Sequence, residues 1–106
     1  MSDLTKIEEI LLLAIWRLKS EAYGVKIRKY VSSVIKKDFS YGNLYSALGQ
    51  LTRKKYVEKT MGLPTPNRRG RSKIYYTVTP LGLEALKQAQ EMNEVLWSGI
   101  NKVAFK

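Results

Sequence analysis

The sequence predicts a mainly α-helical fold of the α+β class that carries one small β-hairpin. Apolar residues recur at helical spacing in three short stretches, and two β-rich stretches then flank a long loop. Thr79-Pro80 is a helix start signal, with an N-cap residue before proline, and opens a fourth helical stretch. The expected helices are about 5–18, 24–36, 40–55 and 80–102, and the expected strands are 56–60 and 73–79. This order is the plan of a winged helix-turn-helix followed by a C-terminal helix.

The composition limits the classes of function. The chain has 106 residues, enough for one domain with a modest core, and 44% of them are apolar. It has no cysteine and no histidine, so thiolate metal sites, the commonest metal ligand and the commonest general base are all missing. Glu84, Glu91 and Glu94 occupy what the pattern indicates is a solvated helix surface. We therefore expect no enzyme, no metal and no cofactor.

Membrane insertion is not expected either. The longest apolar run, Ile10 to Trp16, is far shorter than the roughly 20 residues that cross a bilayer. Glu8 and Glu9 stand directly before it and argue against a signal peptide. The net charge of the last 27 residues is zero rather than basic, which disfavours a membrane-surface role. We expect a soluble, cytoplasmic protein.

The first helix has a clear start and an unusually apolar surface. Thr5 followed three residues later by Glu8 fits a capping box. A helix that is apolar nearly all round is buried nearly all round. In so small a chain, such burial implies cover from a second subunit, so Leu12 and Trp16 are candidate dimer contacts. For Trp16, a place in the core is favoured over contact with a ligand.

The third helix is the candidate recognition helix. Ser40 is its expected N-cap, and Leu44, Leu48 and Leu51 form one apolar stripe. In a helix-turn-helix the last helix enters the major groove, so the opposite, polar face would meet the bases. The candidate DNA contacts on helix 40–55 are Tyr41, Asn43, Tyr45, Ser46, Gln50 and Arg53.

Positive charge is concentrated in the same part of the chain. Of the net charge of +10, residues 41–79 contribute +7, from eight Lys or Arg and one Glu. A basic stretch is often only a solvated face, but confinement to one helix–hairpin unit is typical of a footprint for a polyanion. The candidate backbone contacts of the basic wing, 61–73, are Arg68, Arg69, Arg71 and Lys73.

The last helix carries a heptad-like seam that needs a partner. Its inner positions are Leu86, Ala89, Asn93, Leu96, Ile100 and Val103. A second copy of the chain is the most economical partner, with Asn93 fixing the register. We expect 1–79 to form the DNA-binding unit and 80–106 to form the dimerisation helix of the same compact body.

Three motifs give the sequence a family resemblance. Segment 23–27 reads YGVKI, segment 42–48 reads GNLYSAL and is followed by Leu51, and segment 70–79 reads GRSKIYYTVT and is followed by Gly82 and Leu86. In this combination, which covers roughly residues 8–86, the chain resembles the PadR family of bacterial transcriptional regulators. These are winged-helix homodimers.

The resemblance implies DNA binding by a dimer, usually for repression, through Tyr45 and its neighbours and through Arg71 and Lys73 on the wing. Some members also bind drugs or phenolic compounds between the subunits. Trp16 and Trp97 are the candidate residues for such a small aromatic effector, and an interface core without a cavity is the favoured alternative. Lys55 departs from the family, which commonly has glycine after this helix. We expect either a different helix end or a strained Lys55.

The sequence therefore predicts a dimeric, sequence-specific DNA-binding regulator that acts as a repressor on double-stranded DNA. The alternative is a winged-helix module that docks an acidic protein partner on its basic face, because a fold does not dictate its function. Retardation of duplex DNA would favour the first hypothesis, and co-purification with an acidic protein would favour the second.

Overall fold

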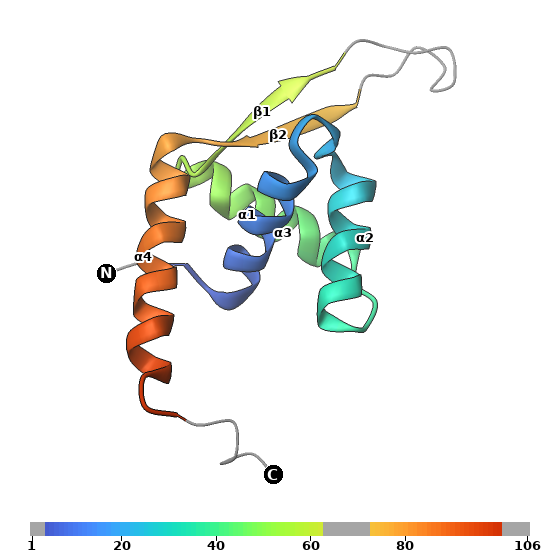
Figure 1. The fold of residues 1–106 in the computed structure, drawn as a ribbon. Coiled ribbons are helices and arrows are strands. Elements are labelled where there is room, and N and C mark those ends of the chain that lie inside the picture. Colours follow the sequence, from blue (N-terminus) through green and yellow to red (C-terminus); the bar gives the residue numbers. More distant parts are fainter. Residues whose placement is uncertain (1–3, 63–72, 101–106) are drawn as a thin grey trace.

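The computed structural model describes residues 4–62 and 73–100 (Figure 1). The elements in chain order are α1 (Lys6–Leu18), a 3-10 turn η1 (Lys19–Glu21), α2 (Gly24–Ile35), α3 (Tyr41–Arg53), β1 (Val57–Met61), β2 (Ile74–Val78) and α4 (Pro80–Trp97). The two strands form an antiparallel hairpin, the wing, along one side of the helices. The predicted winged helix-turn-helix fold is confirmed. No helix of the described residues could span a bilayer.

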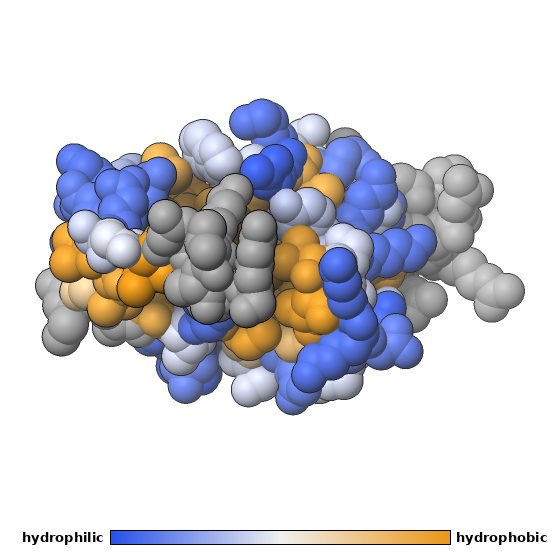
Figure 2. Space-filling model, turned by 60° about the horizontal axis from the view of Figure 1, so that its bottom comes forward, coloured by the Kyte–Doolittle hydropathy of each residue, from blue (hydrophilic) through white to orange (hydrophobic). Residues whose placement is uncertain are grey.

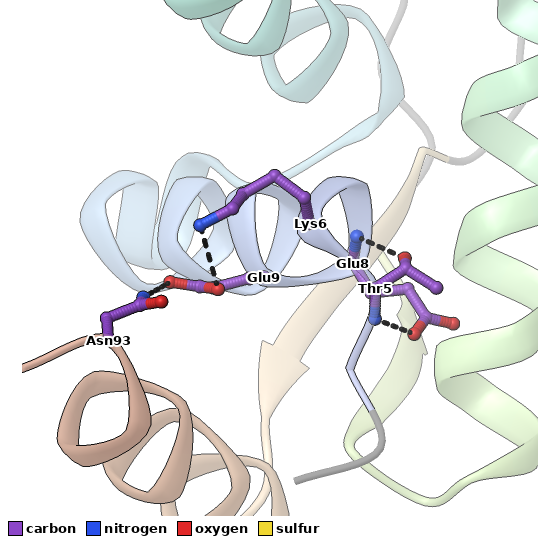
Figure 3. Close-up of polar contacts among 5 residues, drawn as sticks. All are labelled: Thr5, Lys6, Glu8, Glu9 and Asn93. Atoms are coloured by element: carbon purple, nitrogen blue, oxygen red, sulfur yellow. Dashed lines mark hydrogen bonds and ion pairs between the residues drawn. The ribbon is translucent and has the colours of Figure 1, made fainter. Parts of the chain in front are cut away.

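Helix α1 lies at the centre of the molecule and packs against α2, α3, α4 and β2. Thr5 and Glu8 form the predicted capping box, in which the Glu8 amide donates to Thr5 Oγ1 at 3.1 Å and the Thr5 amide donates to Glu8 Oε1 at 2.9 Å (Figure 3). The fully buried core is made largely of Leu11, Leu12, Ile15, Ile27, Val31, Leu44, Leu48 and Leu51.

Two expectations for α1 need correction. Leu12 has no exposed surface within its own protomer, so it belongs to the core and cannot reach a second subunit. Trp16 is not a core residue, since 47% of it is exposed and the Lys19 ammonium lies 4.8 Å from its ring centroid. The apolar faces of α1 are covered mostly by the chain's own helices, except along the side that carries Leu13 and Trp16.

The turn between α2 and α3 is held by three hydrogen bonds. The Phe39 amide donates to Ser32 Oγ at 3.0 Å, and Arg28 Nε donates to the Phe39 carbonyl oxygen at 2.8 Å. Ser40 Oγ accepts from the Asn43 amide at 3.0 Å and caps α3, as predicted. With the Phe39 ring buried beneath it, this turn sets the angle at which α3 leaves α2.

The hairpin register runs from the Val57–Val78 pair to the Met61–Ile74 pair. The outer edge of β2 meets the start of α2, where Tyr23 forms an isolated bridge with Tyr75 and the Tyr76 amide donates to the Ala22 carbonyl oxygen at 2.9 Å. The base of the wing is therefore attached to the N-terminal end of α2.

The end of α3 is a Schellman motif with lysine in the position that glycine usually takes. Lys55 has φ 65°, its amide donates to the Thr52 carbonyl oxygen, and the Tyr56 amide donates to the Leu51 carbonyl oxygen, both at 3.0 Å. Of the two outcomes expected for Lys55, the left-handed one holds. The Lys55 carbonyl oxygen accepts from Thr79 Oγ1 at 2.7 Å, so the strained residue also anchors the start of α4.

Helix α4 is shorter than the expected 80–102. It ends at Trp97, and Gly99 follows in the left-handed region with φ 81°. A helix cannot continue through a residue in this conformation. The apolar periodicity of the sequence therefore extends beyond the end of the helix. Ile100 consequently lies beyond the helix, and Val103 lies outside the described residues.

Candidate nucleic-acid interface

One side of α3 is exposed over its whole length. Leu44, Leu48 and Leu51 fasten the opposite side to the core. The exposed positions include every candidate contact predicted on this helix: Tyr41, Asn43, Tyr45, Ser46, Gln50 and Arg53. Gly42 and Gly49 lie among them, so the outward surface combines small residues with longer polar and aromatic side chains. An α-helix with such a surface can enter the major groove, which is roughly 12 Å wide.

The flank of α3 beside α2 is aromatic. The rings of Tyr41 and Tyr45 stack with centroids 6.2 Å apart, and the Arg28 guanidinium lies 4.6 Å from the Tyr41 centroid. Arg28 was not among the sequence candidates, because its place on the outer side of a helix predicts only a solvated cation. The contact with Tyr41, together with the hydrogen bond to Phe39, holds this guanidinium beside the exposed surface of α3.

The flank of α3 beside α1 is polar and hollowed. Asn43, Ser46 and Gln50 line a depression of about 440 Å³ that also includes Thr5 and Glu8 at the start of α1. Both the amide and the hydroxyl side chains can donate and accept hydrogen bonds, which suits the edges of base pairs. The predicted candidates thus separate into an aromatic flank and a hydrogen-bonding flank of one helix.

The cations at the end of α3 have different roles. Lys54 Nζ lies 2.8 Å from Glu8 Oε1, whose side chain is only 6% exposed, so this ion pair ties the end of α3 to the start of α1. Arg53 is exposed and its guanidinium lies over Gly49 on the outward surface. Of the two, Arg53 is therefore the one directed toward a partner.

The wing contributes Lys73 to the described structure. Its ammonium lies 4.0 Å from the Tyr23 ring centroid at the junction of β2 and α2. Glu58, exposed on β1, is the sole carboxylate within residues 41–79. Arg68, Arg69 and Arg71 lie outside the described residues.

Two pKa shifts lie near this surface. The Glu21 carboxylate, 3.1 Å from Lys26 Nζ, raises the pKa of that exposed lysine and keeps it positively charged at neutral pH. Burial, with a smaller contribution from Tyr45, raises the pKa of Tyr76 above that of a free tyrosine. Both groups therefore stay protonated at neutral pH, one as a cation and one as a hydrogen-bond donor.

The predicted seam of α4 divides into two parts. Leu86 packs against the core and Ala89 is 7% exposed, so the first part lies against the protomer's own α1. Asn93 Nδ2 donates to Glu9 Oε2 on α1 at 3.3 Å (Figure 3). This contact occupies the side chain that was expected to set the register between two copies. By contrast, Leu96 and Ile100 are 65% and 52% exposed.

The two tryptophans line separate hollows. Trp97 borders a groove of about 640 Å³ between α1 and α4, together with Leu13, Leu83 and Leu86. Trp16 borders a hollow of about 290 Å³ beside β2. Within one protomer the two tryptophans therefore line different hollows, and the expected site between two subunits stays a prediction. Figure 2 shows apolar residues reaching the surface on the α4 side, at the left of the view.

Comparisons with known proteins agree on one class. The model of the transcriptional regulator PadR-like family matches residues 12–88. A transcriptional regulator from Clostridium thermocellum is 26% identical, with a TM-score of 0.70 over 91% of this chain and 87% of that chain. A PadR-like regulator from Bacillus cereus is 20% identical, with a TM-score of 0.70 over 92% and 90%. RosR from H. salinarum is 23% identical, with a TM-score of 0.67 over 93% and 82%. No curated protein sequence matches the chain.

The family match covers most of the chain, and the likeness of the solved structures extends to the hairpin and the last helix. RosR comes from an archaeon, so the matches do not restrict the chain to bacteria.

Proposed function

The chain belongs to the PadR-like family of transcriptional regulators, and we propose that it acts as a homodimeric, sequence-specific repressor that reads the major groove with α3. DNA-binding regulation, rather than enzymatic catalysis, is the work of the family. Repression is the proposed direction because a dimer that covers an operator excludes other proteins from the same DNA.

The observation that carries the proposal is the outward surface of α3. It is exposed along the whole helix and bears amide, hydroxyl and guanidinium groups beside the two stacked rings of Tyr41 and Tyr45. A Cβ added at Gly42 would meet only Ser40 Oγ, at 4.0 Å, so packing within the protomer does not require glycine there. Although the first turn of a helix tolerates glycine, close approach of an external partner is the reason that we propose for glycine at this exposed position. Bases and backbone of DNA fit that partner, with Asn43 and Gln50 toward base edges and Arg53 toward phosphate.

The proposed dimer forms through the second part of α4. Val95, Leu96 and Trp97 are 72%, 65% and 59% exposed on consecutive positions. Leu96 continues the line of Ala85 and Ala89 along the helix, past the point where α1 covers it. A twofold pairing of this surface would place two copies of α3 on half-sites about 34 Å apart. Residues 1–79 would then bind DNA and 80–106 would join the subunits.

A small aromatic effector is proposed for the groove beside Trp97. An indole, three leucines and the polar groups of Asn93 and Gln90 line it, a mixture that suits a flat, mostly apolar molecule. Trp97 and Trp16 would contribute to one site only if they came from different subunits. Titration with planar phenols or cations while tryptophan fluorescence is recorded tests this. Quenching in wild type that is lost in Trp97→Phe but kept in Trp16→Phe would place the molecule in the groove.

Selection of bound sequences from a random duplex pool tests sequence-specific DNA binding. The expected result is an enriched inverted repeat, with half-sites whose centres are one helical turn apart. Asn43→Ala and Gln50→Ala should each reduce the discrimination between the selected and a scrambled duplex by about tenfold, because each removes one bidentate base contact. Substitution of Arg69 and Arg71 should weaken both duplexes alike. No enrichment, together with co-purification of an acidic protein, would instead support the docking module.

A further inference from the structure

A second concave site lies at the junction of α2, α3 and the wing. It is a hollow of about 190 Å³, and we call it the tyrosine notch after Tyr23, Tyr45 and Tyr76. The other residues that line it are Gly24, Val25, Lys73 and Ile74. The notch stands where the recognition helix, the base of the wing and the start of α2 meet. Among residues 4–62 and 73–100, no carboxylate lines it.

The first donors at the notch belong to the backbone of α2. Tyr23 precedes this 12-residue helix and gives no side-chain hydrogen bond to its first turn, so the amide N–H groups there have no side-chain cap. The aligned peptide dipoles place partial positive charge at the same end. Helix ends of this kind bind anionic oxygens.

Two tyrosine hydroxyls add to these donors. The Tyr45 hydroxyl lies so close to Gly24 that a Cβ there would come within 2.5 Å of it, which places the hydroxyl against the first turn of α2. Tyr76 is only 5% exposed, and within the described part of the chain no group forms a hydrogen bond with its hydroxyl. A buried hydroxyl without a partner is costly, and an anionic oxygen bound in the notch that Tyr76 lines would supply the missing hydrogen-bond partner. Burial also keeps the pKa of Tyr76 above its ordinary value, and the hydroxyl remains a donor.

Lys73 supplies a full positive charge at the edge of the notch. Its ammonium lies over the Tyr23 ring, whose edge-to-face contact with Tyr75, at 5.6 Å between centroids, fixes the ring. Helix dipole, two hydroxyls and an ammonium all favour the same ligand, a tetrahedral anion with several acceptor oxygens.

We infer that the tyrosine notch binds one phosphate of the DNA backbone, between the groove that α3 reads and the DNA that the wing contacts. This inference rests on the proposed function and extends it, because the sequence candidates did not include Tyr23, Gly24 or Tyr76. A phosphate held there by three elements at once would fix the register of α3 in the groove. It would do so without reading any base.

Paired protein and DNA variants test the inference directly. The probe is a duplex selected from the random pool, prepared as a series in which one backbone phosphate at a time is replaced by an uncharged methylphosphonate. Tyr76→Phe removes only the hydroxyl. Gly24→Ala displaces the Tyr45 hydroxyl while placing a better helix former in the first turn. Tyr30→Phe, which removes a hydroxyl from a half-buried tyrosine on α2 outside the notch, is the matched control.

Loss of one hydrogen bond to a charged phosphate should weaken binding of the unmodified duplex about tenfold in Tyr76→Phe and in Gly24→Ala, but not in Tyr30→Phe. At one phosphate per half-site, methylphosphonate should weaken binding by wild type and weaken binding by Tyr76→Phe less, because the contribution of that hydroxyl is already lost. If the loss from methylphosphonate were the same in wild type and in Tyr76→Phe at every phosphate, or if both notch variants bound as wild type does, the inference would be overturned. In either case, binding of the duplex by wild type would leave the proposed function standing. A wild-type protein that binds no duplex would overturn both. Thermal unfolding of Tyr76→Phe unchanged from wild type confirms that the loss comes from the ligand.

Discussion

The α3 side and the α4 side of the molecule both expose more than a self-contained protein would, but they expose different chemistry. On α3 the outward residues are amides, hydroxyls, glycines and an arginine, in the part of the chain that carries a charge of +7. On α4 the outward residues at the end of the helix are Val95, Leu96 and Trp97, in a segment whose net charge is zero. A polar, cationic surface suits a polyanion, whereas an apolar surface suits another protein surface.

The two sides are joined through α1. Glu8 on α1 pairs with Lys54 at the end of α3, and the next residue of α1, Glu9, accepts a hydrogen bond from Asn93 on α4. The contact between α4 and α1 therefore lies beside the ion pair that anchors the end of α3. This arrangement gives the following predictions, from the largest expected effect to the smallest.

Leu96→Glu should break the proposed dimer without unfolding the protomer. The change places two carboxylates in a twofold apolar interface, and we expect the dissociation constant to rise at least about a hundredfold, or roughly 3 kcal/mol. Sedimentation over a concentration series measures it. Val34→Glu, at an equally apolar exposed position on α2, is the control and should leave the assembly unchanged. Equal effects of the two variants would contradict the distinction between the sides.

Glu8→Ala should destabilise the protomer by about 2 to 3 kcal/mol, because it removes both the buried carboxylate that pairs with Lys54 and half of the capping box. For a chain of this size the midpoint of thermal unfolding should fall by about 10 °C or more. Glu9→Ala is the matched control one residue along. Its partners are an exposed lysine at 3.5 Å and Asn93, so the loss should stay below about 1 kcal/mol. Similar losses in both would mean that Glu8 and Lys54 do not anchor α3.

Lys55→Gly should stabilise the protein by about 1 kcal/mol, because glycine adopts the left-handed conformation at φ 65° without the cost borne by other residues. Urea unfolding measures the gain. Lys59→Gly, at an exposed strand position of ordinary conformation, should give a loss instead. No gain at Lys55 would show that interactions of its side chain offset the strain.

Local rules predicted local features well. The capping box at Thr5, the N-cap at Ser40 and the proline start of α4 each depend on residues within a few positions of one another, and the structure has all three. For Lys55 the sequence left two helix ends open, and the structure has the left-handed one. The recognition face followed from the spacing of three leucines. Such local features can be predicted without knowing which helices and strands pack against one another.

The errors came from partners that are distant in the chain. Periodicity marked Ala89 and Asn93 as positions of a seam between subunits, but it could not tell a second subunit from the protomer's own α1. Leu12 was expected to contact a second subunit because its helix is apolar nearly all round, but the chain's own helices bury it. For Trp16 the core was favoured over contact with a ligand because its helix is apolar nearly all round, but within the protomer its side of α1 is left open. The tyrosine notch was missed because its members come from α2, α3 and β2, and only the folded chain brings them together.

The dependence of duplex binding on salt tests the central claim most directly. If α3, Lys73 and the basic wing bind the DNA backbone, the logarithm of the association constant should fall linearly with the logarithm of salt concentration, by roughly 0.9 per phosphate neutralised. The account predicts a slope equivalent to several phosphates in wild type and a slope smaller by about one phosphate per subunit in Lys73→Gln. Binding that does not change with salt, or a Lys73→Gln slope equal to that of wild type, would contradict it.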